Sequence, residues 1–360
     1  MRPICWLVVA CLVPAGGARG DEPPPRCEVL TPRQDGIVAV GINARGDVLG
    51  LEWREDPKLP GVIGQEPFLA RGGEMTRIPL LPTYTATFPT AVSDDGLVVG
   101  RCGKPGMQGR RVRMSNQAFT WTAADGIKPL ASLPDDWASF AGGVSRDGNW
   151  IAGLSVGDDR MSPCVWERVI EDGRPTWRIA FLPQADRRHC SHVVAISGDG
   201  RRVVAVDGAT PTMWTRAGAI RWTREALGPP GSISPRAVND AGTVVGITSP
   251  PDGSTHAVTW TKVDGVKRIP EPEGYAQSEA AAINNAGAVV GMVDGPHGSP
   301  VGPRAFLFAG GKVRLLDEGG PNFTGAAAIN DRNQVAGSFE AAEEDAPRPA
   351  DPAKPADPKP

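Results

Sequence analysis

Hydrophobic and polar positions repeat along this chain in one short pattern: a small residue, an aliphatic residue, Asn or Ser, a turn, and then two aliphatic residues and usually Gly. The copies begin at Gly41, Ala91, Gly143, Ala195, Ala237, Ala282 and Ala328. They end at Gly50, Gly100, Gly153, Ala205, Gly246, Gly291 and Gly337, at intervals of 41 to 53 residues. Self-similarity with a period in this range predicts a propeller or a solenoid.

The polar positions of the pattern predict a tight hairpin. Asn or Ser, as in Asn43 and Ser93, opens the turn because its side chain can bond a backbone N–H two residues further on. Gly96, three residues after Ser93, suits the left-handed position of a type I turn with a bulge. The seventh copy has Asn333 there instead, and Asn is the non-glycine residue that best tolerates this conformation. The turn polar residues thus have a structural role, and their spacing does not match a calcium loop.

A second pattern follows each of the first six copies and alternates large apolar residues as a strand does, for example over 118–121 and 257–260. A short Leu- or Ile-rich segment comes next, for example over 313–316. Each unit therefore offers four short strands, and helical periodicity is absent throughout. We expect an aromatic residue of the third strand to cover the recurrent Gly of the second, because glycine has no side chain to pack.

These units predict an all-β fold, a β-propeller of about seven four-stranded blades closed by N- and C-terminal strands. A lone unit leaves apolar faces uncovered, and neither end of the chain offers the polar cap that an open stack needs. The segment 26–30 matches a fourth strand and precedes the first copy, whereas the ordered chain ends after the second strand of the seventh. If each blade takes the third and fourth strands of one unit with the first and second of the next, only the first blade is one strand short. Residues 21–340 then form one domain.

The two ends of the chain differ in composition from this domain. Residues 1–20 match a signal peptide, with Arg2, an apolar core over 4–13 and a small-residue region before Asp21. An alternative is a lipobox that ends at Cys11, which would anchor the chain through a lipid. Residues 341–360 are rich in Pro, Ala and charge and predict a disordered tail. The mature chain has no apolar run long enough for a transmembrane segment. We therefore expect a secreted or extracytoplasmic protein of the periplasm or cell surface.

The net charge bears on a nucleic-acid partner, and the cysteines bear on disulfides and metal binding. The formal net charge is −3, and removal of Arg2 and Arg19 makes it more negative, so no nucleic-acid partner is expected. In an oxidising compartment the cysteines after residue 20 allow disulfides, and a bond between Cys164 and Cys190 of neighbouring units is possible. Buried thiols are the equally good alternative. The cluster His189, Cys190 and His192 lacks a zinc spacing, so no metal or other cofactor is expected.

The segment 101–113 adds basic residues to the second unit and is the best candidate for a functional surface. Its cations are Arg101, Lys104, Arg110, Arg111 and Arg113. Such a loop can bind an anionic partner surface or an acidic polymer, although a solvated loop with no function is the simpler interpretation. The carboxylates are scattered through turns, so no catalytic residues are assigned.

The fifth and sixth copies, with His256-Ala-Val-Thr-Trp260 after the fifth, resemble the HAF repeats, a family of probable extracellular repeats. The resemblance covers residues 27–339 and is looser in copies one, three and four. It implies export and a repeat architecture but no established activity. Gln117 and Arg304 stand where the family has His, which argues against a catalytic role for that His.

Together these features predict a non-enzymatic binding scaffold for a partner protein or a polysaccharide of the cell envelope. The alternative is a glycan-active hydrolase or lyase with its site at the propeller channel. A propeller assembles such a site from separate blades, so three carboxylates, or Arg with carboxylates, at one end of the channel would favour the enzyme.

Overall fold

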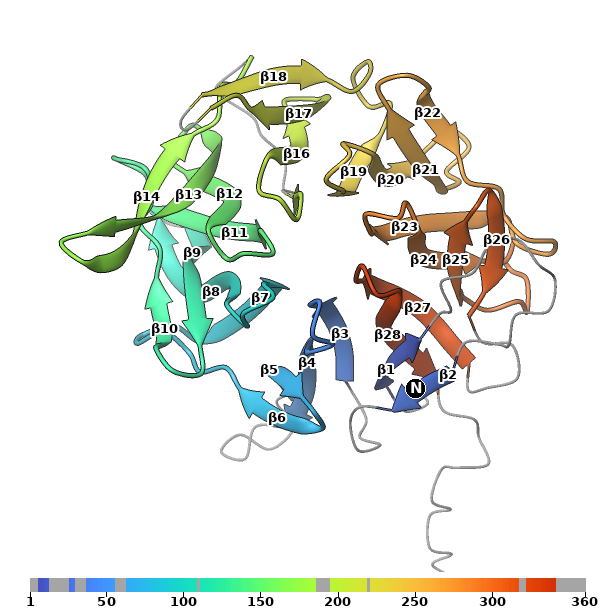
Figure 1. Ribbon diagram of the computed structural model, residues 1–360, viewed down its shortest axis with the longest axis horizontal. Helices are drawn as coiled ribbons and strands as arrows, with labels where there is room; N and C mark the ends of the chain where they lie inside the picture. The colour runs from blue at the N-terminus through green and yellow to red at the C-terminus, as the bar shows by residue number, and fades with distance from the viewer. Residues whose placement is uncertain are drawn as a thin grey trace, which may run out of the picture.

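The computed structural model describes residues 6–12, 26–29, 37–55, 63–108, 111–185, 195–218, 221–316 and 322–340. Their regular structure consists of β-strands β1 to β28. No helix long and apolar enough to cross a bilayer occurs in these ranges. The strands form four-stranded antiparallel sheets that are arranged in a ring (Figure 1), and the innermost strands surround a central channel.

Six sheets each use four strands that follow one another in the sequence, and the first strand of each lies nearest the channel (Figure 1). The first three contain β3 (Ile37–Ile42), β4 (Val48–Glu55), β5 (Ile63–Arg71), β6 (Glu74–Arg77); β7 (Ala86–Val92), β8 (Val98–Gln108), β9 (Arg111–Thr122), β10 (Gly126–Pro129); and β11 (Ala138–Val144), β12 (Trp150–Val156), β13 (Met161–Glu171), β14 (Arg174–Phe181). The next three contain β15 (Ala195–Ile196), β16 (Arg202–Asp207), β17 (Thr210–Arg216), β18 (Trp222–Ala226); β19 (Ser234–Val238), β20 (Val244–Thr248), β21 (His256–Thr261), β22 (Gly265–Arg268); and β23 (Gln277–Ile283), β24 (Val289–Asp294), β25 (Arg304–Ala309), β26 (Lys312–Leu315).

A further four-stranded sheet joins the two ends of the chain. Its inner strands are β27 (Asn322–Ile329) and β28 (Gln334–Glu340), followed outward by β1 (Trp6–Leu12) and β2 (Arg26–Val29). Strand β2 takes the outermost position, as expected for a fourth strand. The third position is filled by β1, which lies inside the segment predicted to be a signal peptide, and Val9 pairs with Gly337 and Val29.

The all-β propeller with four-stranded antiparallel blades is confirmed, but the predicted grouping of strands within a blade is wrong. Six sheets each contain the first to fourth strands of one copy, not the third and fourth of one copy with the first and second of the next. The reason is local: successive strands of a copy are joined by hairpins, and antiparallel neighbours pair directly.

The predicted turn chemistry is confirmed in the hairpins between the first and second strands. Gly96 and Asn333 both have positive φ, 91° and 58°, in the same position of the turn. Asn43 Oδ1 accepts the Arg45 and Asp47 N–H groups at 3.0 and 2.9 Å. The opening side chain therefore satisfies two backbone donors of its own turn.

The recurrent strand glycine is required by a β-bulge that sequence reasoning did not anticipate. The pairing of β11 with β12 shifts register between Ala141 and Gly143, and the bulge turns the Phe140 carbonyl toward Gly153. A Cβ on Gly153 would lie 2.0 Å from Phe140 O and 2.6 Å from Trp166 Cζ3. Coverage by an aromatic residue of the third strand is confirmed here and also at Gly50, Gly100 and Gly291, whereas Gly246 meets the backbone of Ser234 and Pro235.

The core lies between neighbouring sheets rather than inside any one of them. One cluster combines Val99 and Leu130 of one blade with Ile151 and Trp166 of the next. Another packs Ala336 of β28 against Ile37, Ala39, Val48 and Phe68 of the first copy. The ring is therefore stabilised by burial at each joint, including the joint between the two ends of the chain.

Candidate functional site

The hairpin turns of all copies meet around one end of the central channel. The residue after each turn-opening Asn or Ser contributes to a ring, which we call the turn ring: Ala44, Asp94, Arg146, Gly198, Asp240, Asn285 and Asp331. Neighbouring turns are bonded to one another: Ala44 N donates to Asp94 Oδ1 at 2.8 Å, and Asn285 N donates to Asp331 Oδ1 at 2.8 Å. These carboxylates therefore join one blade to the next.

Arg146 reaches across the turn ring from the third copy to the fifth and seventh. Its Nη2 pairs with Asp240 Oδ2 and its Nη1 pairs with Asp331 Oδ2. Asn285 lies between these two carboxylates and donates to both, at 2.8 and 2.9 Å. We call this group the Arg146 lock. One guanidinium thus holds two carboxylates together at the turn end of the channel, and the Asn285 amide links the same two carboxylates.

The arrangement that was expected to favour an enzyme is thus present, but its groups are largely committed to one another. Asp240 Oδ1 accepts the Asp199 N–H at 2.8 Å, while Oδ2 accepts from Arg146 and Asn285. A general acid or base needs an oxygen within reach of a substrate proton. Among the described carboxylate oxygens of the turn ring, only Asp94 Oδ2 accepts no hydrogen bond. The main role of these carboxylates is therefore to connect neighbouring blades.

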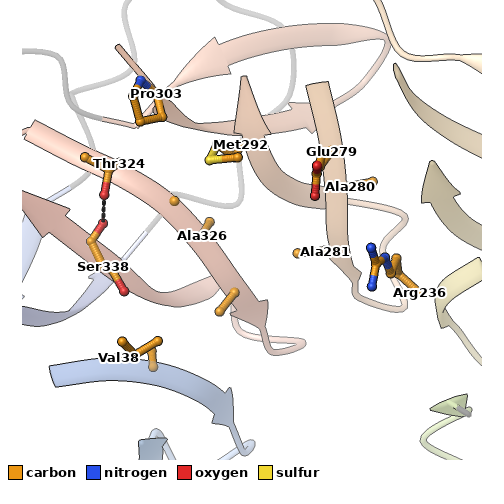
Figure 2. Close-up of a pocket in the computed structure, with 13 residues that line it drawn as sticks. Val38, Arg236, Glu279, Ala280, Ala281, Met292, Pro303, Thr324, Ala326 and Ser338 are labelled. Carbon is orange, nitrogen blue, oxygen red and sulfur yellow. Dashed lines mark hydrogen bonds between the residues drawn. The ribbon is translucent and has the colours of Figure 1, made fainter. Parts of the chain in front are cut away.

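Below the turn ring the channel has an apolar collar and then a larger cavity. The collar and the turn ring together enclose about 280 Å³. The apolar β-branched residues that line this space are Val40, Ile42, Val92, Val144, Ile196, Val238, Ile283 and Ile329. The channel cavity beyond it encloses about 730 Å³ between β3, β19, β23 and β27. Figure 2 shows Val38, Ala326, Ala281, Glu279 and Arg236 around this cavity.

The lining of the channel cavity combines small apolar residues with a few polar groups. Ala280, Ala281, Ala326 and Ala327 leave space that larger side chains would fill. The Thr324 hydroxyl is bonded to the Ser338 carbonyl at 3.1 Å (Figure 2). The cavity can therefore hold an apolar group beside a polar one.

Arg236 and Glu279 are the charged residues of this lining, and they project from neighbouring inner strands. Neither side chain makes a hydrogen bond or an ion pair with any other described residue. A guanidinium and a carboxylate that lack partners in a cavity are available to a ligand. Sequence reasoning missed both, because only the closure of the ring shows that alternate residues of β19 and β23 face the channel.

The predicted basic segment is a hairpin extension rather than a loop over its described residues. Strands β8 and β9 continue past the blade, with Gly106 paired to Arg113 and Gln108 to Arg111. Arg110 lies outside the described residues. The extension arises because both segments can continue the antiparallel ladder beyond the neighbouring strands.

The two cations nearest the blade pack against aromatic rings. Arg101 lies 4.8 Å from the Phe88 ring and 5.6 Å from the Phe140 ring, and burial lowers the pKa of its guanidinium. Lys104 Nζ lies 4.7 Å from the Tyr84 ring. The structure therefore does not gather the predicted cations into one described site, and their binding role stays a prediction.

The structure describes only part of the residues that the sequence singled out for a disulfide or a metal site. The described residues contain no disulfide. Cys164 is a buried thiol packed between blades, in the cluster that also holds Trp166. Cys190, with His189 and His192, lies outside the described residues, so its proposed bond to Cys164 stays a prediction. Among the described residues no group of three or more His, Cys, Asp or Glu is placed to hold a metal ion.

Comparison with known proteins supports the fold alone. No family model matches this chain, and no curated protein matches it. The resemblance to the HAF repeats therefore stays a prediction.

Solved structures match over most of the chain at low identity. The β-propeller domain of the Trilobed protease from Pyrococcus furiosus, described as having an open velcro topology, is 10% identical with a TM-score of 0.52, over 85% of this chain and 96% of that one. The acylaminoacyl peptidase of Pyrococcus horikoshii is 10% identical with a TM-score of 0.51, over 86% of this chain and 53% of the peptidase. The periplasmic gluconolactonase of Pseudomonas aeruginosa is 14% identical with a TM-score of 0.45, over 94% and 99%. This chain spans about half of the peptidase, and its likeness to the two Pyrococcus proteins is that of a β-propeller.

Proposed function

We propose that this protein is a binding propeller that acts outside the cytoplasm and holds a segment of a partner protein in its channel cavity, with no chemistry at the channel. The observation that carries the proposal is the pair Arg236 and Glu279, which face a cavity of about 730 Å³ without partners among the described residues. The volume falls in the range of about 300–1,000 Å³ that is typical of ligand pockets.

The lining favours a peptide segment over a polysaccharide. Ala, Gly and Val side chains suit the apolar side chains of an extended segment, while Arg236 can pair with a carboxylate and Glu279 can accept from N–H groups. The described lining contains no aromatic ring against which the apolar face of a sugar would pack. The Arg146 lock occupies the turn end, so we place entry of the segment at the opposite end.

The proposal includes export, which the composition of residues 1–20 supports. It also includes a seventh blade, the sheet that joins the two ends of the chain. Removal of residues 1–20 would take β1 out of this sheet and leave β2, β28 and β27 to complete it. The protein then acts in the periplasm, at the cell surface or after secretion.

Site-specific photocrosslinking in cells tests the proposal. A crosslinking amino acid at Ala281, inside the channel cavity, is expected to capture one envelope protein, whereas the same amino acid at Val263, which is 93% exposed, is not. Arg236→Ala and Glu279→Gln should each lower the capture at least tenfold. The matched controls Lys312→Ala and Glu74→Gln change exposed residues outside the cavity and should not. Equal capture at both positions, or capture unaffected by both channel variants, would contradict the proposal.

The enzyme alternative is favoured by one observation, the Arg146 lock with its two carboxylates. Turnover of envelope glycans that is abolished by Asp94→Asn and by Arg146→Ala would support it. Because most carboxylate oxygens of the turn ring already accept backbone or guanidinium donors, we expect no turnover. A stability shift with soluble glycans, measured by thermal unfolding, separates simple glycan binding from both proposals.

A further inference from the structure

A serine, a histidine and a glutamate form a connected chain on the fifth copy, away from the channel cavity. Ser254 precedes β21, His256 is its first residue, and Glu271 follows β22. Ser254 Oγ lies 2.9 Å from His256 Nε2, and His256 Nδ1 lies 3.0 Å from Glu271 Oε1. These contacts have the order and the distances of a nucleophile, its base and the group that orients the base.

Hydrogen bonds fix the position of the Glu271 carboxylate and keep it ionised. Burial by itself raises the pKa of Glu271, but hydrogen bonds from Arg268, Ser278 and His256 outweigh it, so the pKa is lowered overall. Arg268 Nη2 lies 2.7 Å from Glu271 Oε2, and the Ser278 hydroxyl donates to Oε1 at 2.7 Å. Glu271 is therefore a carboxylate at neutral pH and an acceptor toward the imidazole.

The serine hydroxyl has two neighbouring acceptors. When Glu271 accepts from a neutral His256, the ring proton lies on Nδ1, and Nε2 presents its lone pair to Ser254. In the structure the hydroxyl donates to Asp252 Oδ1 at 2.6 Å, an oxygen that also accepts the Ser254 N–H at 2.9 Å. Rotation about the Cβ–Oγ bond directs the hydroxyl at Nε2 instead, and in that arrangement His256 can remove its proton.

The fold itself does not require a histidine at this position. In the second copy Gln117 stands in the place of His256, and its Nε2 lies 3.2 Å from Ser139 Oγ. The underlying blade joint is the same in both copies: Ala118 N donates to Ser139 Oγ, and Ala257 N donates to Ser278 Oγ. Gln therefore satisfies this joint, and the chain from Ser254 through His256 to Glu271 is additional to it. A role for His256 alone departs from the sequence expectation that the His of this motif is not catalytic.

Ser254 is more exposed than His256 and Glu271, as expected when a serine reacts with a solute and a buried histidine acts as its base. The side chains of His256 and Glu271 are only 9% and 8% exposed. Ser254 is partly exposed, and the turn residues Asp252 and Gly253 beside it lie at the surface. A small solute can therefore reach the hydroxyl while the base stays sheltered from water.

We propose that Ser254 is an activated nucleophile that accepts acyl groups from small esters, with His256 as its general base and Glu271 as the residue that orients the base. In this step Ser254 Oγ bonds to the carbonyl carbon, and its proton moves to His256 Nε2. The bond from that carbon to the leaving alkoxy oxygen breaks, and the alcohol takes the proton from Nε2. Water then cleaves the acyl-serine by the same route and releases the carboxylic acid.

Labelling of the full chain with a fluorophosphonate probe, followed by mass spectrometry, tests the nucleophile directly. We expect the probe on Ser254 and not on Ser234, an exposed serine at the start of β19, and we expect p-nitrophenyl acetate to be hydrolysed. Ser254→Ala should abolish both. Asp252→Asn, which removes the competing charged acceptor, should leave the labelling rate equal or faster.

His256→Gln separates chemistry from folding because Gln is the residue that the second copy uses. It should lower the labelling rate at least tenfold and remove the dependence of that rate on pH, while the melting temperature stays close to that of the unchanged protein. Glu271→Gln should also slow labelling. Absence of the probe from Ser254, or an equal rate in His256→Gln, would overturn the proposal.

Discussion

The side-chain amide of Asn330 donates a hydrogen bond to the backbone carbonyl of Asn43 at 2.8 Å, across 287 positions of sequence. Both residues open the hairpin turn of their copy, and Asn330 belongs to the last copy while Asn43 belongs to the first. Asn284 makes the same bond to the Asn330 carbonyl at 3.1 Å, and Asn239 makes it to the Asn284 carbonyl at 3.2 Å. A bond that links successive copies thus also links the last copy to the first.

Asn330→Ala should destabilise the ring by about 3 kcal/mol, measured by denaturant unfolding. The side chain is buried, and besides Asn43 it serves the N–H groups of Arg332 and Gln334 at 3.0 Å each. Its loss removes the acceptor of two partly buried N–H groups and one of the two donors to the Asn43 carbonyl, which still accepts from Gly46 N. A loss below about 1 kcal/mol would show that the joint does not depend on this amide.

A double variant separates the contribution of Asn330 to its own hairpin turn from that of its bond to the Asn43 carbonyl. The copies that open with Ser have Asp two residues later, and Ser197 Oγ donates to Asp199 Oδ1 at 2.6 Å while accepting the Arg202 N–H. Asn330→Ser combined with Arg332→Asp should rebuild that turn but not the bond to Asn43. We expect it to recover roughly half of the stability lost in Asn330→Ala. No recovery would mean that the turn contributes little.

Arg146→Ala should destabilise the protein by about 1 kcal/mol, because it leaves Asp240 and Asp331 close together without their shared cation. Since salt screens like charges, added NaCl should raise the melting temperature of the variant more than that of the unchanged protein. Arg178→Ala removes an exposed pair with Glu171 and serves as the control, with an expected change below about 0.5 kcal/mol. Equal salt responses would argue against repulsion in the turn ring.

Gly153→Ala should cost about 3 kcal/mol or more, because the new Cβ would overlap the Phe140 carbonyl and the Trp166 ring. Backbone and a packed indole cannot both move aside. Gly302→Ala is the matched control, since a Cβ there meets nothing within 4 Å, and it should change stability by less than about 0.5 kcal/mol. Thermal unfolding compares the two, and equal effects would refute the bulge as the reason for Gly153.

Acid should remove a specific contribution to stability at Asp47. Burial raises the pKa of this carboxyl, but hydrogen bonds from Arg71 and Asn43 outweigh it and lower the pKa below 3.8. A carboxyl with a lowered pKa stabilises the folded state fully above its unfolded pKa of 3.8, and this contribution is lost as pH falls through the lower, folded value.

Asp47→Asn should therefore be less stable than the unchanged protein at pH 7, and the gap should narrow between pH 4 and pH 2. Melting temperatures across that range measure it. Arg71→Ala, which removes a bond of 2.8 Å to Asp47 Oδ2, should weaken the same acid response. A constant gap at all pH values would contradict the assignment.

The local structure of this protein was readable from the sequence because it depends on neighbours in the chain. The turn-opening Asn and Ser, the left-handed Gly96 and Asn333, and the alternating strands all follow from interactions within a few residues. Covering of the recurrent glycine by an aromatic residue followed from pairing of adjacent strands. The bulge did not, because a register shift such as that between Ala141 and Gly143 has no local signature.

The site depended on contacts that no local pattern records. Arg146 meets Asp240 and Asp331 only because the ring brings the third, fifth and seventh copies to one channel mouth. Arg236 and Glu279 face a shared cavity for the same reason. The grouping of strands into blades also awaited the tertiary structure, since the repeat is equally regular for any choice of starting strand.

The sequence by itself determined the repeat, its hairpins and its all-β class, because these rest on periodicity and short-range backbone chemistry. Only the tertiary structure decided which side chains meet, which residues line the channel, and that β1 stands between β28 and β2. The physical reason is that a propeller places residues of distant copies in contact through packing between sheets, and packing is a property of the whole ring.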